Sequence, residues 1–335
     1  MPIAIPTVDL GDGLSVSAIG FGAMALTPVY GEVDDAESLA TLNHCLDRGV
    51  TFIDTANIYG GGENERLIAN LLANRRDEVT LATKFGIAGN PLDGSRAVRG
   101  DAGYVHECID ESLQRLNTDV IDLYYMHRRD LDVPIEETVG AMAELVAAGK
   151  VRHLGLSEVT ADELRAAVAV HPIAAVQSEW SVRSRDVERN VVSAAAELGV
   201  GFVPYSPLGR GFLTGTVRSV ADLSSSADFR SRMPRFAQGA LDANLAVVDV
   251  VTSIAEEQDA TGAQVALAWL RQRGEQLGVT SVPIPGTRRA TRVDENAGSL
   301  AVTLTPEQMA ALDSAGSVVT GDRFEDLSWV SAGRE

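Results

Sequence analysis

The hydrophobic residues of this chain recur in short runs separated by longer stretches with helical spacing. Eight runs are rich in β-branched or aromatic residues, which favour strands, and they span residues 17–21, 51–56, 79–85, 121–126, 151–156, 175–179, 201–205 and 280–284. Several intervening segments begin with acidic residues or end in glycine, as helices often do. The pattern predicts eight strands, each followed by a helix.

Strands that alternate with helices pair in parallel, because a helical crossover joins parallel strands and a hairpin cannot. Eight such units without a break in composition favour a closed (β/α)8 TIM barrel over an open doubly wound α/β sheet. We expect a single domain over 1–335, with a β-hairpin at 1–16, the barrel at 17–300, and an extra C-terminal helix and tail at 301–335. A Gly-Asp-Gly turn indicates the hairpin, and Thr305 followed by Pro306 indicates the helix.

Composition narrows the range of partners. The 335 residues carry 28 basic and 47 acidic side chains, a formal charge of −19, and such a chain repels the phosphates of nucleic acids. We therefore expect no nucleic-acid partner. Lys84 and Lys150 are the only lysines among the basic residues, which are otherwise arginines.

The sequence shows no targeting or disulfide signal. The N-terminus has no charged segment followed by an apolar run, and no stretch approaches about 18 uninterrupted apolar residues. Cys45 and Cys108 lack paired spacing, which favours buried core positions over a disulfide or a zinc site. We expect a soluble cytoplasmic protein that spans no membrane, and we favour a monomer.

Four chemically active side chains follow neighbouring strand candidates. Asp54, Lys84 and His127 stand at the ends of the second, third and fourth strands, and Tyr59 lies in the loop after the second. In a parallel barrel the C-terminal strand ends meet at one mouth, where the working groups lie. We therefore expect the four side chains to form one proton-transfer site.

These residue types suit chemistry at a C=O or C–OH group. A phenol with a pKa of about 10 transfers protons slowly near neutrality unless a neighbour stabilises the phenolate. A lysine supplies that charge, an aspartate keeps the lysine charged and aimed, and a neutral histidine orients a carbonyl oxygen. Alone, Asp54 would more often be a helix cap and His127 a structural histidine. Their occurrence at successive strand ends favours a shared site.

These segments resemble the aldo-keto reductases. The resemblance is carried by FIDTANIYG at 52–60, ATK at 82–84 and LYYMH at 123–127, which occur in order at the expected strands, and it extends over nearly the whole chain. It implies a catalytic tetrad of Asp54, Tyr59, Lys84 and His127, with Tyr59 as general acid. It also implies hydride transfer from NADPH to a small aldehyde or ketone, without a metal.

The loops after the seventh and eighth strand candidates suit a nucleotide, because barrels tend to build phosphate sites there. Gly20-Phe21-Gly22 is too weak a match to the G-x-G-x-x-G motif to indicate a dinucleotide fold. Arg288, Arg289 and Arg292 are spaced so that two or three converge on one anion at a helix start. In the resembling family this segment holds the 2′-phosphate, which favours NADPH over NADH.

The resemblance also assigns cofactor contacts along the chain. They are Gly22, Ala23 and Met24 beside the nicotinamide ribose, Ser157 and Gln177 at the carboxamide, Tyr205, Ser206, Pro207, Leu208 and Arg210 in the nicotinamide and pyrophosphate loop, and Gly286, Thr287, Arg288, Arg292, Glu295 and Asn296 around the 2′-phosphate and adenine. In this assignment Tyr205 stacks on the nicotinamide ring. Glu158 stands where the family commonly has asparagine, and a carboxylate accepts from the carboxamide NH₂ but cannot donate to its oxygen.

Two other functions fit parts of the pattern. Auxiliary β subunits of potassium channels resemble the same family and retain a cofactor, so a regulatory binding protein is the main alternative. The chain begins almost at the hairpin, so we expect no long N-terminal extension that acts on a pore. A metal-dependent barrel hydrolase is weaker, because the strand ends lack a His-x-His pair or a cluster of carboxylates and histidines.

Overall fold

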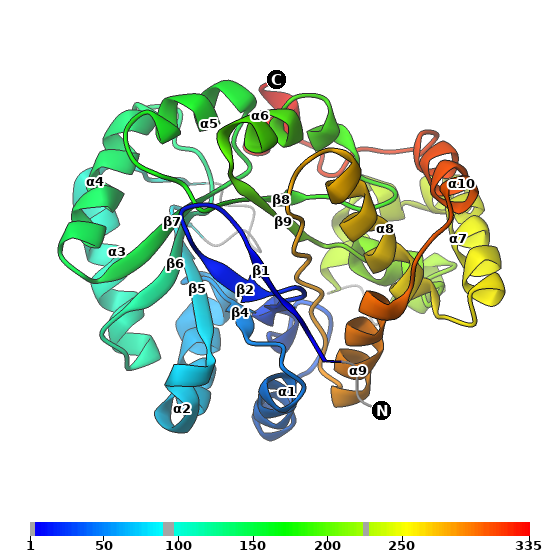
Figure 1. Cartoon of the computed structure of the whole chain (residues 1–335), viewed down its shortest axis with the longest axis horizontal. Coiled ribbons are helices and arrows are strands. Elements are labelled where there is room, and N and C mark those ends of the chain that lie inside the picture. The colour runs from blue at the N-terminus through cyan, green and yellow to red at the C-terminus, as the bar shows by residue number, and fades with distance from the viewer. Residues whose placement is uncertain (1–3, 90–96, 224–227) are drawn as a thin grey trace.

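The centre of the molecule is a parallel β-sheet that curves into a barrel (Figure 1). The computed structural model describes residues 4–89, 97–223 and 228–335. Seven strands pair in chain order: β3 (Phe21–Gly22), β4 (Phe52–Asp54), β5 (Thr80–Phe85), β6 (Ile121–Met126), β7 (Val151–Ser157), β8 (Ala175–Glu179) and β9 (Gly201–Tyr205). The sequence pattern predicted each of these strands, and the (β/α)8 barrel is confirmed.

The predicted eighth strand closes the barrel as an extended segment with a single bridge, between Ser281 and Phe202. Pro283, and the proline two residues later, cannot donate to a strand ladder, which explains why no regular strand forms in this described segment. The segment still bonds to both neighbours. The Val282 amide donates to the Phe202 carbonyl (2.9 Å), and the Pro283 carbonyl accepts from the Gly20 amide (3.0 Å).

The bounds predicted for the first barrel strand, 17–21, are wrong. Ser17 ends the hairpin strand β2 (Ser15–Ser17), and β3 begins only at Phe21. The Ser17 hydroxyl donates to the Ile19 carbonyl (2.8 Å) and accepts from the Phe52 amide (3.2 Å). This local bond to the residue two positions ahead turns the chain between the hairpin and the barrel.

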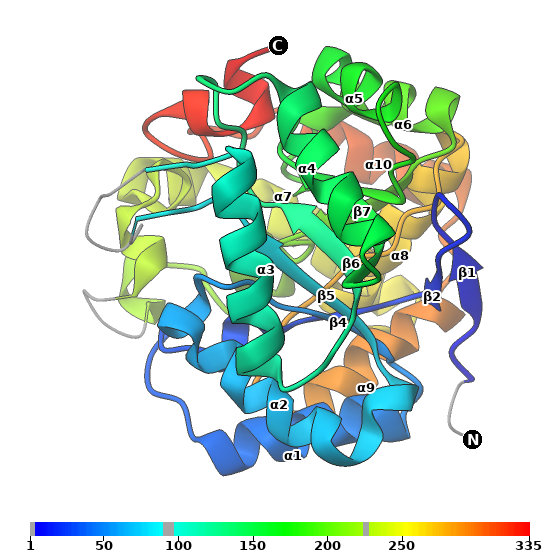
Figure 2. The same ribbon diagram turned by 90° about the vertical axis from the view of Figure 1, so that its left-hand side faces the viewer.

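The N-terminal hairpin is present, as predicted, and consists of β1 (Thr7–Asp9) paired antiparallel with β2. Leu10, Leu14 and Val16 are buried among the residues that fill the barrel interior. The Gly11 amide donates to the carbonyl of Ala174 (2.7 Å), which directly precedes β8. The hairpin therefore covers the N-terminal end of the barrel, and Figure 2 shows it on the opposite side from the C-terminal tail.

Helices surround the sheet and bury their apolar faces against it. They are α1 (Asp35–Asp47), α2 (Glu63–Arg75), α3 (Ala102–Leu116), α4 (Ile135–Ala147), α5 (Ala161–Val168), α6 (Val191–Leu198), α7 (Gln238–Glu257), α8 (Gly262–Gln276), α9 (Ala290–Gly298) and α10 (Pro306–Gly316). The extra C-terminal helix is thus present, capped by Thr305 in a capping box with Gln308. None of the helices in the described residues is both long and apolar enough to cross a membrane.

Candidate active site

The C-terminal ends of β4, β5 and β6 bring the four predicted catalytic side chains together. Asp54 is the last residue of β4, Lys84 lies one residue before the end of β5, and His127 follows β6 directly. Tyr59 begins the short helix η2 (Tyr59–Gly62). The three glycines after it have φ values of 59°, 66° and 95°, a left-handed region that favours glycine, and they lead the chain from Tyr59 into α2.

Lys84 and Asp54 form a buried ion pair beneath the mouth. The Lys84 Nζ atom donates to Asp54 Oδ1 (2.5 Å) and to the Thr55 carbonyl (2.7 Å). The other Asp54 oxygen accepts from Gln177 Nε2 (2.8 Å), so a third strand end supports the pair. Both side chains are almost fully buried, at 0% and 2% exposure. The Lys84 ammonium is thus held by two protein acceptors rather than by solvent, and Gln177 holds one of them, Asp54, in place.

Tyr59 lies over this pair and beside His127. The Lys84 Nζ atom is 5.2 Å from the centre of the Tyr59 ring. The Tyr59 and His127 rings meet edge to face, with centres 5.9 Å apart. His127 Nδ1 is buried and has no hydrogen-bond partner among the described residues. One imidazole and one phenol thus stand side by side above a buried ammonium.

Burial is the largest cause of the pKa shifts of the four side chains at this site. It raises the pKa of Asp54 and lowers the pKa of Lys84, and the charge of each group opposes the shift of the other. Burial also raises the pKa of Tyr59, with the Asp54 charge as the next cause. It holds the pKa of His127 well below its ordinary value, aided by the charges of Arg128 and Lys84. Tyr59 is therefore a protonated phenol and His127 a neutral imidazole near neutral pH.

The two residues assigned to the carboxamide lie next to this site, and each has a protein hydrogen-bond partner. Gln177 donates to Asp54, as described above, and therefore belongs to the ion-pair network. The Ser157 hydroxyl at the end of β7 accepts from Arg128 Nη1 (3.3 Å). Arg128, which the sequence did not single out, is buried and also donates to the His127 carbonyl (2.7 Å).

The loop after β9 carries the predicted nicotinamide and pyrophosphate contacts, which are Tyr205, Ser206, Pro207, Leu208 and Arg210. The Tyr205 hydroxyl donates to Glu158 Oε1 (2.7 Å). Ser206 and Arg210 adopt left-handed backbone conformations, with φ values of 50° and 58°. Arg210 Nη1 donates to the Tyr30 hydroxyl (2.9 Å), which joins this loop to the one that follows β3.

The loop after β3 and the loop after the closing segment pack backbone against backbone at Gly22 and Gly286. A Cβ on Gly22 would lie 2.7 Å from the Ile284 carbonyl oxygen, and Gly286 packs against the Gly22 backbone on the same path. Ala23 and Met24 follow in the short helix η1 (Ala23–Leu26), and Thr287 accepts from the Arg289 amide (3.1 Å). The first and last loops of the barrel are therefore adjacent.

The predicted arginine cluster is only partly assembled. Arg288 donates to the carbonyls of Tyr30 and Glu32, and Arg292 pairs with Glu295. A cavity of about 170 Å³ at the start of α1 is lined by Glu32, Val33, Asp34, Glu37, Ser38, Arg288 and Arg289. Two of the three arginines thus line one cavity, together with three acidic residues.

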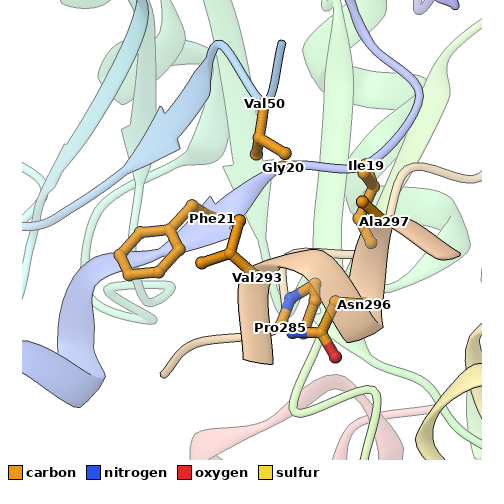
Figure 3. A pocket seen from close by; sticks show the side chains of 8 residues that line it. All are labelled: Ile19, Gly20, Phe21, Val50, Pro285, Val293, Asn296 and Ala297. Carbon is orange, nitrogen blue, oxygen red and sulfur yellow. The ribbon is translucent and has the colours of Figure 1, made fainter. Parts of the chain in front are cut away.

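Asn296, assigned to the adenine, lies on α9 and is buried. Figure 3 shows it beside Pro285 at a cavity of about 10 Å³, lined otherwise by apolar residues such as Phe21 and Val293. Such a volume holds about one water molecule. The close packing of α9 on β3 fixes the helix that carries Arg292, Glu295 and Asn296.

Three arginines around the mouth have buried nitrogens, and sequence reasoning predicted Arg210 but missed Arg128 and Arg183. Arg128 Nε, Arg210 Nε, and Arg183 Nε and Nη1 are buried and have no hydrogen-bond partner among the described residues. Arg183 packs over the rings of Phe212 and Phe236. No sequence signal marks Arg128 or Arg183, because most basic residues of this chain are arginines. Their unused donors give the mouth a chemistry suited to an anion.

The chain is similar to known proteins along nearly its whole length. Residues 18–317 match the model of the Aldo/keto reductase family. A probable aldo-keto reductase 1 of Glycine max is 41% identical over 334 residues, which cover 97% of this chain and 94% of the relative. The crystal structure of a thermostable aldo-keto reductase, in complex with the inhibitor epalrestat, matches with a TM-score of 0.73 and 28% identity, covering 93% of this chain and 100% of that chain. The chain therefore belongs to the aldo/keto reductase family.

Proposed function

We propose that the protein is an NADPH-dependent reductase of aldehydes or ketones, in which Tyr59 protonates the carbonyl oxygen as general acid. Membership of the family makes it an oxidoreductase that acts on carbonyl compounds. The observation that carries the finer proposal is the buried Lys84–Asp54 pair directly beneath the Tyr59 ring and beside His127.

In the proposed reaction, the substrate oxygen lies between Tyr59 and His127. The neutral imidazole donates a hydrogen bond that orients this oxygen, and the phenol transfers its proton as negative charge develops there. Lys84 stabilises the phenolate that remains, because its ammonium is held near the ring by Asp54 and the Thr55 carbonyl. The alcohol product leaves, and solvent restores the phenol proton.

The residues at the mouth fit a nicotinamide dinucleotide, which supplies the hydride when bound. The fit rests on buried guanidinium nitrogens of Arg128, Arg183 and Arg210 that have no hydrogen-bond partner within the described ranges, since such donors suit an anionic ligand. The residues that would hold the dinucleotide are the cofactor contacts assigned above, from Gly22 to Asn296, with one exception. Gln177 already donates one N–H to Asp54, so only its other N–H and its carbonyl oxygen could serve the carboxamide.

Arg289→Ala is expected to weaken NADPH binding by about tenfold or more while changing NADH binding little. Arg289 is exposed, lines the cavity beside Arg288, and would pair with the 2′-phosphate that NADH lacks. Titration of each nucleotide against protein fluorescence measures both affinities. Arg66→Ala, which removes an exposed arginine on α2, is the control.

An equal loss for both nucleotides would contradict the assignment of Arg289. A native preference for NADH would contradict the choice of NADPH. Carboxylates would be the cause of a preference for NADH, because Glu32, Asp34 and Glu37 line the same cavity and a carboxylate accepts hydrogen bonds from an unphosphorylated ribose.

Steady-state NADPH consumption with a panel of aldehydes and ketones tests the proposed function against the regulatory alternative. A reductase turns over at least one carbonyl class repeatedly. A cofactor-binding subunit of the channel type binds NADPH but oxidises it with little turnover. Binding without turnover across the panel would favour the subunit, and an absence of binding would reject both.

A further inference from the structure

The C-terminal tail, residues 320–335, docks on the barrel mouth through Glu158. The Glu158 side chain has 0% exposure. Its Oε1 atom accepts from the Tyr205 hydroxyl (2.7 Å), the Glu179 amide (3.1 Å) and Arg323 Nη2. Its Oε2 atom accepts from the amide and the hydroxyl of Ser331, at 3.1 and 3.2 Å. A carboxylate offers about four lone-pair sites, so these five donors leave none for another ligand.

Arg323 is a buried residue of the tail, with 2% exposure. Its guanidinium donates to the Tyr205 hydroxyl (2.8 Å) and to Asp186 (2.9 Å), and it lies 3.4 Å from a Glu179 oxygen. Arg323 thus faces two buried carboxylates, Glu158 and Glu179, a partly exposed one, Asp186, and one phenol. Without this cation, those carboxylates would repel one another in a region that excludes water.

The contacts of Arg323 join three consecutive strand ends. Glu158 follows β7, Glu179 ends β8 and Tyr205 ends β9. Arg334 adds a further attachment of the tail, since its Nη2 atom donates to the Glu158 carbonyl (2.6 Å) and to Glu163 (3.0 Å). Figure 2 shows the tail, in red, over this end of the barrel. The tail is therefore part of the frame around the mouth.

The charges around Glu158 support its contact with the tail. Burial by itself raises the pKa of Glu158, but the nearby charges of Arg323 and Arg128 outweigh it and hold the pKa at about 2. Glu158 is thus a carboxylate at neutral pH and keeps its hold on Arg323.

We propose that Arg323 is a positioning residue, which acts through Glu158 and Tyr205 to fix the face of the mouth that receives the nicotinamide. Glu158 then serves as the anchor of the C-terminal tail and is not a ligand of the carboxamide, although it stands where the family commonly has asparagine. The Tyr205 hydroxyl is the link, because it bonds to both Glu158 and Arg323. The role of Tyr205 rests on the proposed function, whereas the anchoring of the tail does not.

Arg323→Gln is the main test. We expect chymotrypsin, which cleaves after aromatic residues, to cut the tail at Phe324 and Trp329 faster than in the native protein, and the dissociation constant of NADPH to rise by about tenfold or more. Substrate turnover at saturating NADPH should change much less, because Arg323 does not touch the tetrad. Arg218→Gln, which breaks an exposed pair with Asp249, is the control for both measurements.

Tyr205→Phe tests the same proposal by NADPH affinity and chymotrypsin cleavage if Arg323→Gln does not fold. It retains the ring and removes only the linking hydroxyl, so NADPH affinity should fall while the tail stays protected. An unchanged NADPH affinity in this variant, or a protected tail with native affinity in Arg323→Gln, would overturn the proposal. A release of the tail with native NADPH affinity would overturn the positioning role alone.

The native protein separates this proposal from the proposed function. If the native chain binds no nicotinamide nucleotide, the proposed function fails. The chymotrypsin comparison between native protein and Arg323→Gln still tests the anchor. Glu158→Asn completes the set: a freed tail is expected, and tighter NADPH binding with a protected tail would show that Glu158 faces the cofactor after all.

Discussion

Tyr59→Phe is expected to lower kcat for carbonyl reduction by about 10²- to 10⁴-fold, the usual contribution of a general acid. The substitution keeps the ring that meets His127 edge to face and removes only the hydroxyl. Because burial raises the pKa of Tyr59, the native phenol is protonated at neutral pH and serves as an acid. NADPH binding should remain measurable. The decrease in NADPH absorbance under steady-state conditions measures the rate.

Tyr124→Phe is the matched control for this result. Tyr124 lies on β6, two residues before its end. It is fully buried and stacks on Phe85, with the ring centres 5.1 Å apart. Its hydroxyl has no hydrogen-bond partner among the described residues, so its removal should leave the rate unchanged. Full turnover by Tyr59→Phe would sink the assignment of the general acid, because no other phenol meets His127 in the described part of the chain.

Lys84→Met is expected to abolish reduction and to lower the free energy of unfolding by about 3–5 kcal/mol. The variant removes the cation next to Tyr59 and leaves Asp54 as a buried charge with only Gln177 as a side-chain donor. Denaturant titration gives the stability, and NADPH oxidation gives the rate. Lys150→Met is the control, because this lysine forms a partly exposed pair with Asp110 and should change stability by about 0–1 kcal/mol.

The double variant Asp54→Asn/Lys84→Met distinguishes the two roles of the pair. It removes both charges, so most of the lost stability should return, since the cost in the single variant comes from the uncompensated carboxylate. The reduction rate should stay low, because the phenolate still lacks its cation. Recovery of the rate together with the stability would mean that Lys84 supports the fold and not the chemistry.

Local pattern was sufficient to predict the barrel and the grouping of the four side chains. Strand ends are visible in the hydrophobic runs, and parallel strands place their C-terminal ends at one mouth. Asp54, Lys84 and His127 therefore meet because of where each strand ends. The same reasoning placed the strand at 280–284 but not its irregularity, which follows from proline amides that cannot donate.

Contacts between distant segments were not predictable in this way. The pair between Arg323 and Glu158 spans 165 residues, and neither residue shows a local sign of its partner. Gln177 was expected at the carboxamide, and its contact with Asp54 depends on the registry between distant strands. Arg128 and Arg183 carry no signal either, because arginine is common throughout this chain. A single sequence indicates which element carries each side chain, whereas tertiary packing determines which side chains contact one another.

The placement of the two lysines has a practical consequence for immobilisation. Lys84 has 0% exposure, whereas Lys150 directly precedes β7, at the end of the barrel opposite the mouth, and is partly exposed. Besides the α-amino group, Lys150 is thus the one side-chain amine that a surface-bound ester reaches readily. Coupling through it ties the protein to a support by its closed end and turns the mouth toward the bulk solution.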